Sequence, residues 1–248
     1  MVKRIGFIFM TVFIVFVLNV VINFASPSKN KLQQENHAPV VKIISPKNNS
    51  VFDWNIQFNY SISVSDKEDG ESKYDEINTK EVLLEVKYIA DESKITDELN
   101  KAVQSDPPGL AVIRTSNCFN CHAFNAKSVG PSFYDINKKY PATTSNIALL
   151  VKNIREGSTG VWGKVSMPTH PELTKEETQD IVQWMFQNAA DTSTNYFIGT
   201  EGSFRIKPPA GSQQKATYML TASYPDHGVN DASKQHLKGQ DIIIIHSR

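Results

Sequence analysis

The distribution of hydrophobic and polar residues divides the chain into three kinds of segment, and the first is an uncharged N-terminal stretch. Residues 5–25 carry no charged side chain and follow the basic pair Lys3 and Arg4. A membrane-spanning helix needs about 20 apolar residues, whereas the apolar core of a signal peptide has about 7–15. The length of the uncharged stretch therefore favours an uncleaved signal-anchor (transmembrane) helix in residues 1–25, and a cleaved signal peptide is the open alternative. The basic pair predicts that residues 26–248 lie outside the cytoplasm.

Short β-type runs form the second kind of segment and occur in two regions. Polar residues 26–36 are predicted to be a tether that leads into the first region. The runs lie at residues 40–44, 56–64, 82–89, 196–206, 216–224 and 241–246, with turn residues between them. We therefore predict a small β-sandwich over residues 37–92 and a separate C-terminal β module over residues 191–248.

A helical section of residues 108–190 is predicted between the two β regions. The polar segment before it, residues 93–107, is predicted to be a linker, with a loose helix as the alternative. Asp106 stands before two prolines, which predicts a helix N-cap followed by proline in the first turn. A hydrophobic stripe with helical spacing ends at Gly157. The sequence from Thr174 onwards has the pattern of a capping box that opens a last helix.

Composition and charge narrow the classes of function. The 248 residues include 26 basic and 26 acidic side chains, so the formal net charge is zero. Nucleic-acid-binding domains usually carry a basic face, so no nucleic-acid partner is expected. We find no Ser-His-Asp set, P-loop or dinucleotide fingerprint, and therefore expect the chain to be no enzyme by itself, with no catalytic residue.

The only two cysteines of the chain, Cys118 and Cys121, stand close together in the sequence Cys-Phe-Asn-Cys-His. Two cysteines are too few for a disulfide scaffold or an all-cysteine zinc site. A redox dithiol of this spacing belongs beside a βαβ unit, and none is predicted. CxxCH is the attachment sequence of c-type haem, in which the adjacent His122 is placed to bind the iron.

Two downstream segments, residues 129–133 and 160–168, complete a resemblance to the class I c-type cytochromes of the small bacterial monohaem type. The resemblance covers about residues 110–190 and implies an all-α module with one covalent haem c. It implies that Cys118 and Cys121 form the thioethers and that the axial ligands of the iron are His122 and Met167. It further implies that the Pro131 carbonyl accepts the proximal imidazole N–H and that Trp162 lies near a haem propionate.

Several other residues have alternative interpretations. His170 could replace Met167 as a ligand, but a local hydrogen bond is the favoured role. Met185 is expected in the core of the last helix and Met219 in a β segment outside the helical section, while the remaining histidines are expected on the surface or in local hydrogen bonds. The acidic turn of residues 66–71 could bind calcium, and a solvated turn is favoured.

The resemblance implies a function in the bacterial cell envelope. A six-coordinate His/Met iron leaves no open position for substrate, so the expected role is one-electron transfer between a dehydrogenase or quinol oxidoreductase and a terminal acceptor such as a terminal oxidase. The N-terminal β region resembles immunoglobulin-like or PKD-type domains of exported proteins. The alternative function is carbohydrate or protein binding by the β modules, with Trp54, Tyr60 and Tyr224 as candidates, although a core position is favoured for each.

Overall fold

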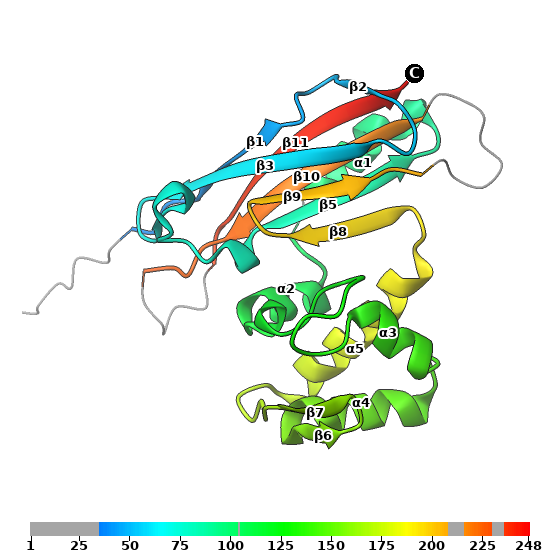
Figure 1. Cartoon of the computed structure of the whole chain (residues 1–248). Helices are drawn as coiled ribbons and strands as arrows, with labels where there is room; N and C mark the ends of the chain where they lie inside the picture. Colours follow the sequence, from blue (N-terminus) through cyan, green and yellow to red (C-terminus); the bar gives the residue numbers. More distant parts are fainter. Residues whose placement is uncertain (1–34, 104, 208–215, 230–235) are drawn as a thin grey trace, which may run out of the picture. The chain divides into compact units, whose positions relative to one another are not determined.

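The computed structural model describes residues 35–103, 105–207, 216–229 and 236–248 (Figure 1). The predicted signal-anchor, residues 1–25, lies outside the described residues, as does the tether apart from Glu35 and Asn36. Within the described ranges, no helix combines the length and the apolar character that a membrane crossing requires.

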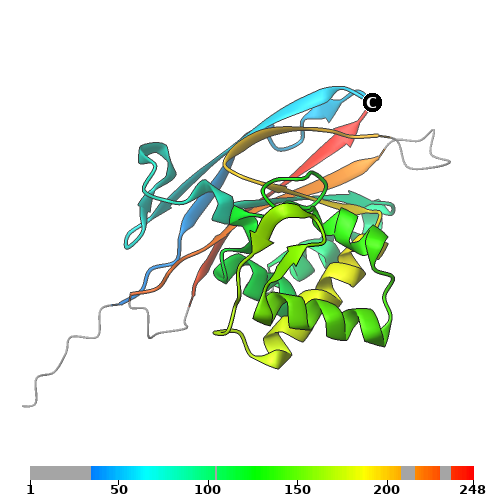
Figure 2. The ribbon, with the colours of Figure 1, turned by 60° about the horizontal axis from the view of Figure 1, so that its bottom comes forward.

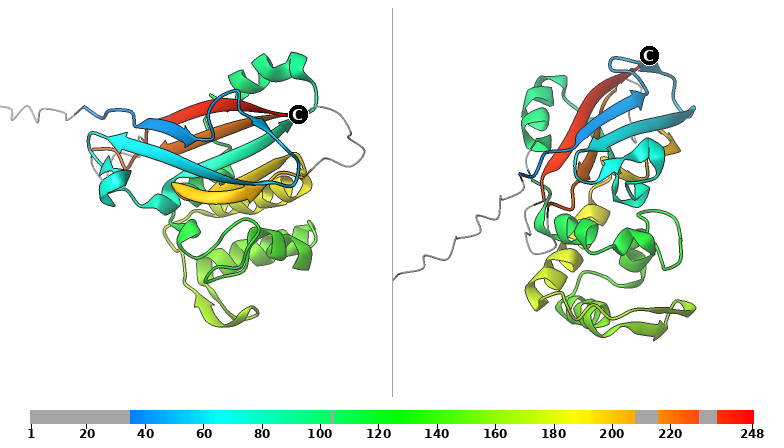
Figure 3. Two further views of the ribbon diagram at one scale, coloured as in Figure 1. Left: turned by 45° about the horizontal axis from the view of Figure 1, so that its top comes forward. Right: turned by 90° about the vertical axis from the view of Figure 1, so that its left-hand side faces the viewer.

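In the part of the chain that the structure describes, nine strands form two β-sheets, and each sheet contains strands that lie before and after the helical section (Figures 1 and 3). The first sheet consists of β1 (Val40–Ser45), β3 (Gln57–Asp66), β4 (Gly70–Glu71) and β9 (Glu201–Arg205). The second has the order β2 (Val51–Phe52), β11 (Lys238–Ser247), β10 (Thr217–Pro225), β5 (Leu83–Ile89) and β8 (Thr194–Ile198).

The prediction of two separate β modules is therefore wrong. β3 pairs with β9, placing Phe58 opposite Phe204, and β10 lies between β5 and β11. Residues 37–92 alone hold only part of each sheet, so neither segment can satisfy its backbone hydrogen bonds without the other. Alternation along a strand predicts the strand and its buried face, but it does not identify the partner strand.

The two sheets share one hydrophobic core and together form a β-sandwich, the name we use for these nine strands. Tyr60 and Tyr224 lie inside this core, with 4% and 0% of their surface exposed. Trp54 is partly buried against it and meets the Phe52 ring edge-on at 5.3 Å. The predicted core position is confirmed for Tyr60 and Tyr224, whereas Trp54 packs against the edge of the core and is partly exposed.

Residues 108–190, which we call the helical module, are inserted between the neighbouring strands β5 and β8 (Figure 2). Its helices are α2 (Pro108–Thr115), α3 (Phe133–Lys139), α4 (Thr144–Glu156) and α5 (Lys175–Ala190). Helices α2 and α5 cross closely at Gly109, where an added Cβ would collide with the Asp180 carbonyl oxygen and the Trp184 Cβ. Glycine at this position therefore permits the contact between the first and last helices of the module.

Several predicted helix ends are present. The capping box of α5 is complete, since Thr174 Oγ1 accepts from the Glu177 amide at 3.1 Å and the Glu177 carboxylate accepts from the Thr174 amide at 2.8 Å. Helix α4 ends at Gly157 with φ +81°. The N-cap of α2 is Pro107, whereas the sequence predicted Asp106, whose carboxylate instead binds Arg114.

Three further features were not predicted or were predicted only as an alternative. The helical module is not all-α, because β6 (Ser158–Gly160) and β7 (Gly163–Met167) form a hairpin whose turn uses two glycines with positive φ. Of the two interpretations of residues 93–107, the helical one is correct, because the segment contains α1 (Ile95–Ala102). The described residues also contain four short 3₁₀ turns: η1 (Ser72–Tyr74), η2 (Thr79–Glu81), η3 (Glu92–Lys94) and η4 (Cys118–Asn120).

Candidate haem site

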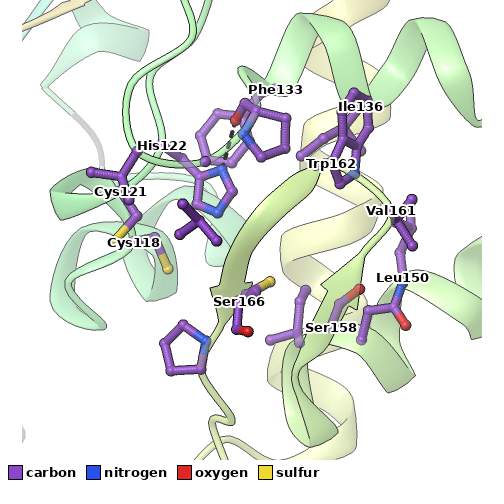
Figure 4. A pocket seen from close by; sticks show the side chains of 18 of the residues that line it. Cys118, Cys121, His122, Phe133, Ile136, Leu150, Ser158, Val161, Trp162 and Ser166 are labelled. Atoms are coloured by element: carbon purple, nitrogen blue, oxygen red, sulfur yellow. Dashed lines mark hydrogen bonds between the residues drawn. The ribbon is translucent and has the colours of Figure 1, made fainter.

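The sequence Cys-Phe-Asn-Cys-His folds as a tight turn directly after α2. Asn117 adopts the left-handed conformation with φ 59°, which asparagine tolerates better than most residues, and so reverses the chain. The Cys118 carbonyl then accepts from the amides of Cys121 at 3.1 Å and His122 at 2.9 Å. Both cysteines are free thiols. The turn therefore brings two thiols and one imidazole to the same wall of a cavity (Figure 4).

The cavity has a volume of about 420 Å³ and a predominantly apolar lining. Cys118, Cys121 and His122 lie on one side of it, and Val161 and Trp162 of the hairpin on the other (Figure 4). Apolar side chains of α2, α3, α4 and α5 complete the wall, among them Ile113, Ile136, Leu150, Ile154, Ile181 and Val182. A planar, largely apolar macrocycle with one metal ion matches this apolar lining and the thiols and imidazole on its wall.

His122 is oriented by three contacts. Its Nδ1–H donates to the Pro131 carbonyl at 2.7 Å, the contact that the family resemblance implied, which leaves Nε2 as the unprotonated nitrogen of the neutral ring (Figure 4). Its ring stacks on Phe133 with 5.6 Å between centroids and an interplanar angle of 11°. Gly130 lies so close that an added Cβ would stand 2.8 Å from His122 Cε1. Burial lowers the pKa of His122, and nearby His170 lowers it further, so the imidazole is neutral and its Nε2 lone pair is free to bind a metal.

Met167 ends β7 and lines the same cavity as His122. Its position is fixed by the hairpin, in which it pairs with Ser158, and by the end of α4. An added Cβ on Gly157 would stand 2.9 Å from the Met167 carbonyl oxygen, so the glycine lets the two segments approach. The structure thus brings two residues that are far apart in sequence to one cavity.

Trp162 lies between the two hairpin strands and lines the cavity, with 36% of its surface exposed. The Lys139 ammonium lies 4.6 Å from the centre of its ring, and Tyr140 meets the ring edge-on at 6.5 Å. The cation–π contact holds the indole at the cavity mouth. Lys139 was missed by the sequence analysis because it reads as an ordinary basic residue in the last turn of a helix.

The alternative ligands occupy the positions expected of them. His170 lines the cavity, and its Nδ1 bonds the Glu172 carboxylate at 2.8 Å, the local hydrogen bond that was favoured. Met185 is 4% exposed on the inner face of α5, although it also reaches the cavity wall. Met219 lies in β10, 1% exposed and outside the helical module.

The candidates outside the module have structural roles. In the acidic turn, Asp66 Oδ1 accepts from the amides of Glu68 at 2.9 Å and Asp69 at 2.7 Å. Among the described residues, no group of three or more histidine, cysteine or acidic side chains is arranged to hold a metal ion. The other histidines make hydrogen bonds, but with residues at longer sequence separations than expected: His37 with Glu68, His227 with Glu81, His236 with the Asp226 carbonyl and His246 with Thr217.

The fold and the site define a covalent haem-attachment domain, and comparison with known proteins identifies its family. The cytochrome c family model matches residues 108–189. Cytochrome c-552 of Hydrogenobacter thermophilus is 36% identical over 85 residues, which cover 31% of this chain and 86% of that protein. Cytochrome c-551 of Ectopseudomonas mendocina is 35% identical over 77 residues, 31% of this chain and 93% of that protein. The crystal structure of wild-type Nitrosomonas europaea cytochrome c552 aligns at 29% identity and a TM-score of 0.30, covering 32% of this chain and 96% of that one.

The chain therefore belongs to the cytochrome c family through its helical module. It is a monohaem class I electron carrier with one covalently bound haem c. Family membership also supports the location in the cell envelope that the sequence predicted. The matched residues end at 189, so the β-sandwich lies outside the region of similarity.

Proposed function

We propose that the chain is a membrane-tethered electron carrier whose haem iron is bound by His122 and Met167. The observation that carries the proposal is that these two side chains line one cavity while Pro131 already holds the far nitrogen of the imidazole at 2.7 Å. Cys118 and Cys121, on the wall next to His122, form the thioethers. Electrons enter from a dehydrogenase or quinol oxidoreductase and leave to a terminal acceptor such as a terminal oxidase.

The protein side chains set the conditions for reversible one-electron transfer, which the iron supplies when haem is bound. The thioether of Met167 favours the reduced state, and an apolar wall that excludes water raises the potential further. Pro131 fixes the orientation of His122, so the ligand needs little rearrangement when the iron changes its charge. Trp162, which lines the cavity and contacts the Lys139 ammonium, would donate its indole N–H to a propionate.

We further propose that the β-sandwich is of the immunoglobulin-like type. Its first sheet joins β1, β3 and β9, and its second continues β11, β10, β5 and β8. Labelled A to G in chain order, these are strands A, B and E facing G, F, C and an added C′, an arrangement close to that of immunoglobulin domains. In this scheme the helical module replaces the loop between C and C′.

Ligand substitution tests the iron site. The haem-loaded wild-type protein is expected to show the absorption spectrum of low-spin His/Met ligation, and Met167→Ala is expected to lose it. Met185→Leu is the matched control, because Met185 also reaches the cavity but belongs to the core of α5. Retention of the spectrum in Met167→Ala would refute the assignment of the sixth ligand.

Membrane fractionation tests the tether. The full chain is expected in the membrane fraction and a chain that begins at Glu35 in the soluble fraction. If the protein expressed from the full sequence is instead recovered in the soluble fraction and has lost its N-terminal segment, that segment is a cleaved signal peptide. This outcome would contradict tethering.

A further inference from the structure

The haem-attachment turn makes a hydrogen bond to a residue outside the helical module. Lys80, in the 3₁₀ turn η2 of the β-sandwich, donates through Nζ to the Asn120 carbonyl at 3.1 Å. Asn120 stands immediately before Cys121, in the segment that separates the two cysteines. A lysine far away in sequence therefore contacts the peptide that spans the two attachment points.

The neighbouring carbonyls of the turn have partners inside the helical module. The Cys118 carbonyl accepts from Cys121 and His122, and the Cys121 carbonyl accepts from the Gly130 amide at 2.8 Å. A backbone carbonyl needs a donor from some source, and for Asn120 the protein provides a charged one from the β-sandwich. Hydrogen bonds from a charged donor are stronger than those between neutral groups.

The backbone that carries Lys80 is fixed on both sides. Asn78 Oδ1 accepts from the Lys80 amide at 3.1 Å and caps η2. Arg114 of α2 donates through Nη2 to the Glu81 carbonyl at 3.2 Å. Leu83, two residues further on, is 3% exposed and packs in the hydrophobic core of the helical module. The backbone of Lys80 is thus held against the helical module, so its side chain can reach the Asn120 carbonyl.

We propose that Lys80 is a positioning residue of the haem-attachment turn and that its ammonium raises the reduction potential of the haem. The inference rests on the proposed His/Met haem site. Reduction adds one negative charge to the haem, and a nearby fixed cation stabilises the more negative state by Coulomb attraction. Because the ammonium is exposed to solvent, salt and water screen this attraction, and its effect is moderate.

Redox titration of the haem-loaded chain tests the inference. Lys80→Met removes the charge and the hydrogen bond, and we expect the equilibrium constant for reduction to fall about two- to threefold, or about 20–30 mV at ~59 mV per tenfold change for one electron. Lys80→Arg keeps the charge and is expected to restore most of the potential. The deficit of Lys80→Met is expected to shrink when the salt concentration is raised.

Lys73→Met is the matched control, because it makes the same change in net charge in the neighbouring turn η1. Lys73, in η1, is paired with Glu71 at 2.7 Å. An equal potential in Lys80→Met, Lys73→Met and the wild-type protein would overturn the inference. Absence of the His/Met spectrum in the wild-type protein is a separate outcome, which would overturn the proposed iron site.

Discussion

The buried arginine between α2 and the β-sandwich offers the most direct test of how the two parts of the molecule depend on each other. Arg114 is 3% exposed and donates to the Asp106 carboxylate at 2.7 Å. It also donates to Ser223 Oγ at 3.0 Å and the Ser223 carbonyl at 2.9 Å in β10, and to the Glu81 carbonyl at 3.2 Å. One side chain thus joins the helix that precedes the haem-attachment turn to two segments of the sandwich.

The perturbation is Arg114→Leu. Removing one partner of a buried ion pair costs about 3–5 kcal/mol, because the other charge loses its compensation. Asp106 retains a second cation, Lys238 at 3.1 Å, so its own penalty is reduced. The carbonyls of Glu81 and Ser223 lose donors without replacement. We therefore expect the free energy of unfolding to fall by about 3 kcal/mol, near the lower limit of this range. At ~2–4 °C per kcal/mol for a chain of this size, Tm is expected to fall by about 6–12 °C.

The assay is urea and thermal unfolding of the haem-loaded protein, followed by haem absorbance for the helical module and by far-ultraviolet circular dichroism for the whole chain. The two signals are expected to change together in the wild-type protein and to separate in Arg114→Leu. The control is Arg155→Leu, since Arg155 is exposed on α4 and its loss is expected to cost no more than about 0.5 kcal/mol. If Arg114→Leu lowers the free energy of unfolding by less than ~1 kcal/mol, or by no more than Arg155→Leu does, Arg114 does not stabilise the contact between α2 and the sandwich.

Three further predictions concern single residues. In Gly130→Ala the new Cβ meets His122 Cε1 at 2.8 Å, so we expect a loss of about 1–3 kcal/mol in urea unfolding of the haem-loaded protein, with Ser128→Ala unchanged. Tyr196→Leu removes the ring that stacks on Phe124 at 4.9 Å and meets Trp184 at 5.8 Å, which is expected to cost about 1–3 kcal/mol, while Tyr134→Phe on the surface costs less than ~0.5 kcal/mol. The hydrogen bond to Glu81 raises the pKa of His227 from 6.5 to about 9, so its stabilisation is complete below pH 6.5 and is lost as the pH rises to about 9. The Tm difference between the wild-type protein and His227→Gln is therefore expected to disappear by pH 10; a difference that grows with pH would contradict this sign.

Features determined by neighbouring residues could be predicted from the sequence. The Thr174 capping box and the Gly157 helix end depend on a few adjacent side chains, so their patterns carry the whole signal. The contact of His122 with Pro131 could be predicted because the family resemblance assigns it to that motif, and the structure gives it a distance of 2.7 Å.

Features determined by pairing across long sequence separations could not be predicted. Nothing in the β3 pattern identifies β9 as its partner, because alternation along one strand gives its buried face but not the strand beside it. Arg114 reads as one charged residue in a short helix, and its burial follows only from the position of β10. Lys80 likewise gives no signal in the sequence, since its partner is a backbone carbonyl and any residue has one.

The insertion between neighbouring strands explains why the helical module and the β-sandwich depend on each other. Because β5 and β8 are paired side by side, with Leu83 opposite Ile198, the sandwich holds both ends of the inserted segment close together. Bringing the ends of a long loop together costs conformational entropy, which rises slowly with loop length. When the sandwich is folded, the two ends of the insert are already close together, so folding of the helical module loses less conformational entropy. The folded helical module in turn lets β5 and β8 pair without a long disordered connection between them. Leu83, Tyr196 and Ile198 then complete the hydrophobic core of the module. Loosening the pairing of these two strands should therefore destabilise the haem site even though neither strand lines its cavity.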